Sequence, residues 1–405
     1  MSHFRIHFWT LSSIATVIIL VILALKPDWG FYGHRTINKL AVFTLPQEML
    51  PLFKKNITYI SDHAVDPDMR RYATKHEAVR HYIDIDQWDT IPFTKIPRDF
   101  NEAILRFGDL LMVNDNGDTS KIQIDWTKTI DSLPVKIGSE TIQVKKANLV
   151  NFVREELMSK YYDEEMTTDI MVFNSWIKSK RTNKRYTRIV LIDKFSDHGI
   201  LPFYLEIAMN KLTYAFKAKD KNAILRNAAD IGHYIGDAHV PLHTTTNYNG
   251  QFTDQLGIHA FWESRLPELF AEKEYDFFVG KAEYITDNKT YIWEIITKSH
   301  SYLKDVLAVE KKLSQTYPSD QQFCYDQRLN LTVRIQCKEY SKAYHEALFG
   351  MVEERMTSSI KAIGDIWYTC WINAGSPNLK NLNDGIFQEE KITADPNIKT
   401  REHEN

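Results

Sequence analysis

The stretch His233-Tyr-Ile-Gly-Asp237-Ala-His239-Val-Pro241-Leu-His243-Thr-Thr-Thr-Asn247 decides which fold and which chemistry this 405-residue chain is expected to have. His233 and Asp237 are four residues apart, so on a helix both side chains project from one face toward one point. Pro241 prevents the helix from continuing, and His243 can then turn back toward the same point. The stretch therefore predicts a metal site built on a helical scaffold.

A second pair, His259 and Glu263, repeats the four-residue spacing farther along the chain. Imidazole and carboxylate groups without a nearby thiolate are typical of catalytic rather than structural zinc sites. A purely structural use would require each of these groups to be buried and paired, which costs free energy. His239 faces away from His233 by helical geometry, and we expect it to support the site or to lie in the core.

Helical periodicity dominates the rest of the chain, and one stretch, residues 121–146, alternates like β-strands. Helices are predicted at His34–Leu45, Phe100–Met112, Leu149–Lys160, Pro202–Ala218, Lys221–Ala238, His259–Glu272, Ile292–Ser314 and Glu339–Asn373. The candidate ligands fall into two groups, so we interpret residues 29–375 as one helical domain that contains a small mixed insertion at about 89–197. Residues 376–405 are polar and aperiodic, which predicts a mobile tail.

Composition sets limits on partners. The chain is 43% hydrophobic and carries a net charge of −3, so it has no global field that would attract polyanions. Residues 8–25 lack charges, which predicts a signal peptide or an N-terminal membrane anchor within residues 1–28 and an exported, extracytoplasmic or periplasmic protein. Of three cysteines, Cys324 and Cys337 could form a disulfide, leaving Cys370 buried or free.

Three upstream segments contain further candidate ligands: Trp29-Gly-Phe-Tyr-Gly33-His34, Asp62-His63-Ala-Val-Asp66-Pro-Asp68 and His81-Tyr82-Ile-Asp84. Together with these segments, residues 233–247 resemble the signature of bacterial zinc-dependent phospholipase C. One departure is His239, where that family usually has Asp, Asn or Ser. The single-strand-specific zinc nucleases of the P-one type belong to the same superfamily, and their matching segment, often with a His there, is also similar.

The resemblance implies an all-α, multi-helix fold with three zinc ions in one cleft. It implies nine metal ligands: Trp29, His34, Asp66, His81, His233, Asp237, His243, His259 and Glu263. In the family, processing exposes the tryptophan, so that its free amine binds metal. Here Lys26-Pro27-Asp28 precede Trp29, a poor context for signal peptidase. If the chain stays uncleaved, Trp29 offers only an amide, and the third ion would be weak or absent.

The resemblance also implies how the site residues act. A hydroxide bridging the metals would attack a phosphodiester in line, and Asp66 is the candidate catalytic residue that orients or deprotonates it. Tyr82 and Asp84 are candidate substrate contacts. The nucleases tend to have a basic residue three positions after the metal-binding Asp; counted from Asp66 that position is Met69, and the neighbouring Arg70 is the candidate substitute.

Three functions stay open at this stage. The first is a zinc phosphodiesterase similar to phospholipase C, which acts on phospholipid head groups and is associated with the membrane through residues 8–25. The second is a single-strand-specific endonuclease or 3′-nucleotidase, whose substrate is single-stranded nucleic acid. The third is a non-catalytic surface binding protein stabilised by metal, although structural sites normally need fewer ligands. No protein partner is inferred.

Overall fold

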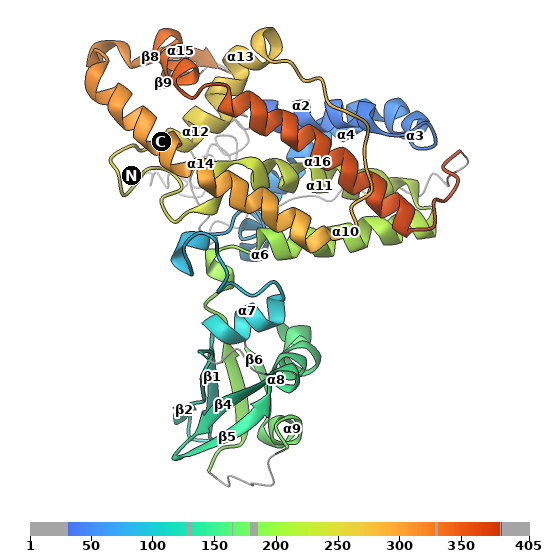
Figure 1. Ribbon diagram of the computed structural model, residues 1–405, viewed down its shortest axis with the longest axis vertical. Helices are drawn as coiled ribbons and strands as arrows, with labels where there is room; N and C mark the ends of the chain where they lie inside the picture. Colours follow the sequence, from blue (N-terminus) through green and yellow to red (C-terminus); the bar gives the residue numbers. More distant parts are fainter. Residues whose placement is uncertain are drawn as a thin grey trace, which may run out of the picture.

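A computed structural model describes residues 31–127, 131–163, 165–178, 185–328, 331–380 and 382. It consists of a helical body and a smaller subdomain that contains most of the β-strands (Figure 1). Trp29, residues 8–25 and nearly all of the polar tail lie outside the described residues. Among the helices that are described, none combines the length and the apolar character needed to span a membrane.

Five long helices form the frame of the body: α2 (Phe31–Ala41), α10 (Leu201–Ala218), α11 (Lys221–His239), α14 (Asn288–Thr316) and α16 (Met351–Asn373). Helix α11 lies among the other four, and its last nine residues, from Ile231 on, are all buried. Glycine at position 236 allows α2 to approach closely, because a Cβ there would lie 2.8 Å from His34 Nδ1. The central helix is therefore the one that carries the His233/Asp237 pair.

Shorter elements complete the body. Along the chain they are η1 (Val42–Thr44), α3 (Leu50–Lys55), α4 (Ile57–Asp62), η2 (His63–Val65), α5 (Asp66–Arg70), α6 (Lys75–Ala78), η3 (Ile85–Gln87), η6 (Ser196–His198), η7 (Pro241–Thr244), α12 (Ile258–Ala260), the π-helical η8 (Phe261–Arg265), α13 (Leu266–Glu274), η9 (Ser319–Gln321), β8 (Phe323–Arg328), β9 (Leu331–Gln336) and α15 (Lys338–Ala347). The β8–β9 hairpin is closed by a Cys324–Cys337 disulfide, and Cys370 is buried.

The insertion has its own hydrophobic core, made of residues between Ile104 and Leu191. Its strands form two antiparallel sheets, one in the order β2-β1-β7-β6 and one in the order β3-β4-β5. Its elements are α7 (Phe100–Phe107), β1 (Asp109–Val113), β2 (Thr119–Lys121), β3 (Gln123–Ile124), β4 (Ser132–Ile137), β5 (Glu140–Lys145), α8 (Lys146–Phe152), the π-helical η4 (Val153–Leu157), η5 (Met158–Lys160), β6 (Met166–Asp169), α9 (Ile170–Trp176) and β7 (Arg188–Ile192).

The predicted mostly helical fold is confirmed, and so are the strands within residues 121–146. The chain contains more β-structure than expected, however, because β1, β6, β7 and the β8–β9 hairpin lie outside residues 121–146. The helix predicted over Phe100–Met112 ends at Phe107, and Asp109–Val113 pairs with a strand on each side, so tertiary pairing overrides the helical pattern. The helix predicted over Glu339–Asn373 is interrupted by Phe349 and Gly350, both at positive φ.

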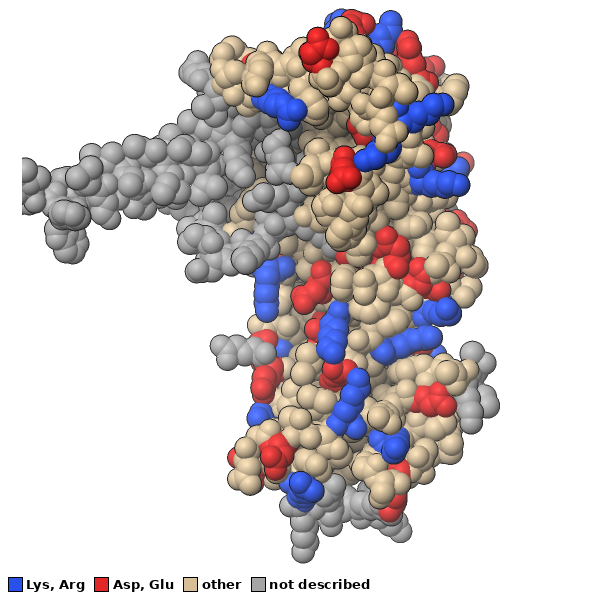
Figure 2. Space-filling model, turned by 90° about the vertical axis from the view of Figure 1, so that its left-hand side faces the viewer, with Lys and Arg blue, Asp and Glu red and all other residues tan. Residues whose placement is uncertain are grey.

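Charged side chains are mixed over the surface. On the side of the molecule shown in Figure 2, Lys and Arg are interspersed with Asp and Glu over both the body and the insertion. This distribution agrees with the small net charge of the chain. Among the described residues, this side therefore offers no extended basic surface for a polyanion.

The chain leaving the insertion is hydrogen-bonded to the segment around His81. Ile200 N donates to Val79 O at 2.7 Å, and Leu201 N donates to Tyr82 O at 3.1 Å. Gly199 directly precedes these two donors at φ 89°, and a Cβ there would lie 2.1 Å from Tyr82 O. Only glycine fits this position, because both the backbone conformation and the close approach exclude a side chain.

We predict that Gly199→Ala destabilises the protein by on the order of 2 kcal/mol or more, because strain at positive φ and a steric clash add together. Chemical denaturation followed by circular dichroism measures the change. Gly280→Ala is the matched control, because a Cβ at Gly280 meets nothing within 4 Å. Equal midpoints for the two variants would contradict the prediction.

Candidate metal centre

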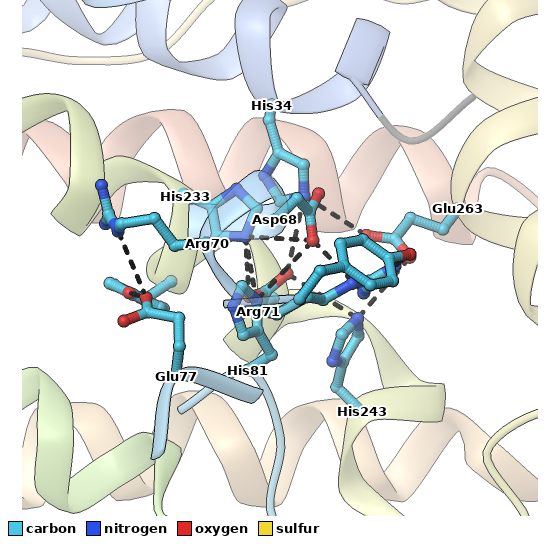
Figure 3. Close-up of polar contacts among 12 residues, drawn as sticks. His34, Asp68, Arg70, Arg71, Glu77, His81, His233, His243 and Glu263 are labelled. Atoms are coloured by element: carbon cyan, nitrogen blue, oxygen red, sulfur yellow. Dashed lines mark hydrogen bonds and ion pairs between the residues drawn. The ribbon is translucent and has the colours of Figure 1, made fainter. Parts of the chain in front are cut away.

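Eight imidazole and carboxylate side chains from the helical body converge beneath α2 (Figure 3). They are His34 on α2, Asp68 on α5, His81 in the loop after α6, His233 and Asp237 on α11, His243 on η7, His259 on α12 and Glu263 on η8. They form three groups that could hold a metal ion: His34 with His233 and Asp237, Asp68 with His81 and His233, and His243 with His259 and Glu263. Trp29, the ninth expected ligand, lies outside the described residues.

The carboxylate of Asp237 lies at the centre of the cluster. Its Oδ2 is 3.0 Å from His81 Nδ1 and 3.3 Å from His233 Nε2. Its Oδ1 faces His34 Nε2 at 3.5 Å and His243 Nε2 at 3.7 Å. Because its two oxygens face different imidazoles, Asp237 is placed to contact two ions at once.

A second carboxylate, Glu263, completes the group beside Asp237. Its Oε2 lies 2.8 Å from His259 Nε2 and 3.5 Å from His243 Nε2, while its Oε1 is 3.4 Å from His34 Nε2. The π-helical turn Phe261–Arg265 carries this residue, directly after the short helix that carries His259. Local unwinding of this kind is frequent at functional sites.

The hydrogen bonds around the imidazoles fit a metal. His233 Nδ1 faces the carbonyl of Ala64 at 2.8 Å, and His259 Nδ1 faces the carbonyl of Tyr248 at 3.0 Å. A carbonyl accepts, so in the neutral ring Nδ1 carries the proton and the Nε2 lone pair points into the cluster. There it meets carboxylate oxygens of Asp237 and Glu263, an arrangement that repels unless a cation lies between. Such backbone partners are what orient histidine ligands in known metal sites.

Burial sets the charges of the cluster. It lowers the pKa of His233 and lowers that of His81 well below the usual range, so both rings are neutral at pH 7. Burial also raises the pKa of Asp237 to about 7, despite the opposing effect of His243. For Glu263, burial alone would raise the pKa, but the surrounding histidines hold it well below the ordinary value. A divalent cation would favour the ionised form of both carboxylates.

Asp66 does not lie in the cluster. Its Oδ2 is bonded to His63 Nδ1 at 2.8 Å, whereas Asp68 Oδ1 lies 3.8 Å from both His81 Nδ1 and His233 Nε2. Two residues apart on the short helix α5, the aspartates project about 200° apart, so only one can face the site. The structure therefore places Asp68 where the resemblance had placed Asp66.

Arg71 is a site residue that the sequence interpretation missed. Its Nη1 lies 3.3 Å from Asp68 Oδ1, and its side chain is largely buried. Although burial opposes the charge, Asp68 raises the pKa of the guanidinium, so it stays positive. Arg71 is three positions after Asp68, the spacing described for the nucleases. Three positions after Asp66 is Met69, so the sequence alone did not single out Arg71. The orientation of α5 shows that Asp68 is the aspartate that faces the cluster, and Arg71 lies three positions after it.

Arg70, the expected substitute, points away from the cluster (Figure 3). Its Nη2 donates to Asp230 at 2.8 Å, and its Nε lies 3.7 Å from Glu77. Asp84, another expected substrate contact, is buried and bonded to His198 Nδ1 at 3.0 Å. Both residues therefore connect parts of the scaffold.

Tyr82, directly after His81, lines a cleft of about 870 Å³ between the body and the insertion. Tyr161 and Tyr248 also line it, and Tyr248 is the residue whose carbonyl orients His259. The charged groups on its walls are Lys75, Asp163, Glu165, Arg188, Asp193 and Asp197. Four carboxylates thus face two cations, and Arg188 is already paired with Glu165 at 2.7 Å.

His239 has a supporting role at most, as expected from helical geometry. Its Nδ1 is 2.7 Å from the carbonyl of Ile235, one turn earlier on the same helix. Its own carbonyl accepts a hydrogen bond from Arg355 Nε at 3.1 Å. The ring thus contributes to packing between α11 and α16 rather than to the metal groups.

Comparisons with protein-family models, with curated proteins and with solved structures give no match.

We predict that Asp68→Asn lowers the metal content of the purified protein, whereas Asp66→Asn leaves it unchanged. The reason is that, of the two aspartates on α5, only Asp68 has a carboxylate that faces His81 and His233. Elemental analysis after gel filtration measures bound zinc per chain, and circular dichroism verifies that both variants are folded. Loss of metal from the Asp66 variant alone would restore the original assignment.

Proposed function

We propose that this protein is a zinc-dependent phosphodiester hydrolase that acts on phospholipid head groups in the manner of phospholipase C. The observation that carries the proposal is the convergence of eight nitrogen and oxygen ligands with one buried guanidinium. A structural zinc site needs only four ligands, so a set of this size favours a catalytic site with more than one ion. The resemblance of residues 233–247 to the phospholipase C signature supports the same reaction.

Zinc is the metal that best suits this ligand set, because five imidazoles and three carboxylates without thiolates match catalytic zinc chemistry. Three ions are expected, and the third depends on Trp29. Bound zinc would supply Lewis-acid activation of water and neutralise charge on the phosphoryl oxygens. In this proposal Asp68, rather than Asp66, orients the attacking water.

The chain's own groups would hold the substrate. Arg71 offers a charged, planar donor next to Asp68, suited to the phosphoryl oxygens of a phosphodiester. Tyr82 and Tyr248 would contact the group esterified to the phosphate, because both residues line the cleft and each adjoins a candidate ligand. Tyr82 follows His81 directly, and the carbonyl of Tyr248 faces His259 Nδ1. The ligand-bearing histidines are almost fully buried, which keeps bulk water away from the reacting atoms.

The charge of the cleft favours a phospholipid head group over nucleic acid. Among the described residues its walls carry four carboxylates and two cations, and this excess of negative charge would repel a polyanion that entered the cleft. The cleft would not repel a phospholipid head group whose alcohol is neutral or bears an ammonium group. A disulfide at Cys324–Cys337 also supports the proposed export to an oxidising compartment.

A single-strand-specific nuclease is the second candidate, and one observation favours it. Arg71 follows Asp68 by three positions, the spacing described for the nuclease branch. The same guanidinium could bind the phosphate of either substrate, so it supports the reaction class more strongly than the choice of substrate.

We predict that the full chain loaded with zinc releases phosphocholine from phosphatidylcholine and leaves single-stranded DNA intact. Parallel assays measure soluble phosphocholine and acid-soluble nucleotides, with Asp237→Asn as the inactive control. Nucleotide release alone would replace the first candidate by the nuclease. Inactivity toward both substrates and toward an aryl phosphodiester, with zinc bound, would support the non-catalytic binding protein.

We predict that Arg71→Met lowers kcat by about 10²–10³-fold, because a charged donor to the transition state is lost. Zinc content should stay unchanged, since Arg71 is not a ligand. Arg71→Lys should recover part of the activity by restoring the charge without the planar fork. Steady-state kinetics on a soluble short-chain ester measures all three proteins. Unaltered kcat in the Met variant would exclude a role in catalysis.

A further inference from the structure

One loop beside the metal centre exposes two large apolar side chains. It runs from Asn247 to Gly257, between the ligands His243 and His259. Phe252 is 72% exposed and Leu256 is 61% exposed. Exposed apolar residues are common singly, but two on one loop at the edge of a catalytic centre indicate an interaction surface.

The loop is held rigidly, so the exposure of these side chains is imposed by the fold. Asn247 Oδ1 accepts from Phe252 N at 2.8 Å, and Asn249 Oδ1 accepts from Gly257 N at 3.0 Å. Gln255 is buried and donates to Leu307 O at 2.9 Å. Three buried amide side chains therefore pin the backbone while Phe252 and Leu256 face the solvent.

The same loop is coupled to the metal ligands at its C-terminal end. His259 Nδ1 bonds to Tyr248 O at 3.0 Å, and His259 N is 3.4 Å from Asn249 Oδ1. A surface formed by Phe252 and Leu256 thus has a fixed position relative to the site. Met69, 41% exposed and next to Asp68, is a third apolar side chain near the ligands.

The sequence before the described part of the chain indicates what this surface contacts. Residues 8–25 carry no charge, and a stretch of this length is at the lower limit for spanning a bilayer. Only residues 26–30 separate them from Phe31, where α2 begins, and His34 lies on the first turn of that helix. At full extension this connection reaches about 20 Å. A bilayer that held residues 8–25 would therefore lie close to the metal centre.

We propose that the loop Asn247–Gly257 docks on a lipid bilayer, with Phe252 and Leu256 inserted at the interface and the metal centre facing the membrane. The surface suits a zwitterionic bilayer, because the 99% exposed side chain of Asp254, between the two apolar residues, lies 3.8 Å from Lys311 Nζ. The loop therefore presents a balanced pair of charges rather than a basic patch that would select an anionic membrane. The inference rests on the proposed function, since the bilayer is the source of the phospholipid substrate.

The test uses the full chain reconstituted into phosphatidylcholine vesicles, with an environment-sensitive fluorophore attached at Phe252→Cys. Cys370 is buried and the other cysteines form the disulfide, so labelling is selective. Tyr214→Cys is the matched control: Tyr214 is 73% exposed but lies about 20 Å along α10 from Leu201, which adjoins Tyr82. Lipids brominated in their acyl chains should quench the label at position 252 and leave that at position 214 unaffected.

A second measurement uses the double variant Phe252→Ser/Leu256→Ser. Its hydrolysis of vesicle phosphatidylcholine should fall by about 100-fold, because insertion of each side chain contributes about tenfold. Its hydrolysis of a soluble short-chain ester should equal that of the wild type. Equal losses on both substrates would assign the loop to catalysis and overturn docking.

The two proposals fail in distinguishable ways. Quenching at position 252 without hydrolysis of any lipid supports docking and overturns the proposed function. Hydrolysis of phosphatidylcholine with no quenching at position 252 overturns docking and leaves the function in place. A label that responds to single-stranded DNA but not to vesicles would assign the surface to nucleic acid and overturn docking.

Discussion

The carboxylate of Asp237 is the group on which the rest of the structure depends. It is almost completely buried, and imidazoles from four different elements approach its two oxygens. Burying this charge with neutral partners is unfavourable, as its raised pKa indicates. A divalent cation between Asp237 and these imidazoles would stabilise the arrangement, because it favours the ionised carboxylate. Because Gly236 has no side chain, α2 can pack close to α11, and this close packing places His34 in the same cluster.

The insertion is joined to this cluster through the segment that bears His81 and Tyr82. The exit from β7 forms hydrogen bonds to Val79 and Tyr82, and Gly199 is required for that close contact. The cleft lined by Tyr82 exists because the sheet of the insertion is fixed in this position. A subdomain with a separate hydrophobic core can thereby shape the site without contributing a ligand.

Much of the candidate site could be predicted from sequence because its key spacings are local. Pairs four residues apart, such as His233/Asp237 and His259/Glu263, project from one face of any helix. The strands β1 and β7 could not be predicted, since each is stabilised by partners far away in the chain. Arg71 could not be recognised from sequence, because its place beside the candidate ligands depends on which aspartate of α5 faces them.

The sequence by itself determined the mostly helical fold, the residue types of the candidate ligands and the two helical pairs at their core. These follow from periodicity and from the preference of zinc for imidazole and carboxylate. Only the tertiary structure decided which aspartate of α5, Asp66 or Asp68, faces the cluster. It also decided that Arg71 rather than Arg70 lies beside the cluster, and that a cleft lies next to Tyr82. The physical reason is that these features depend on the rotation of α5 and on the docking of the insertion, and both are fixed by contacts between residues distant in sequence.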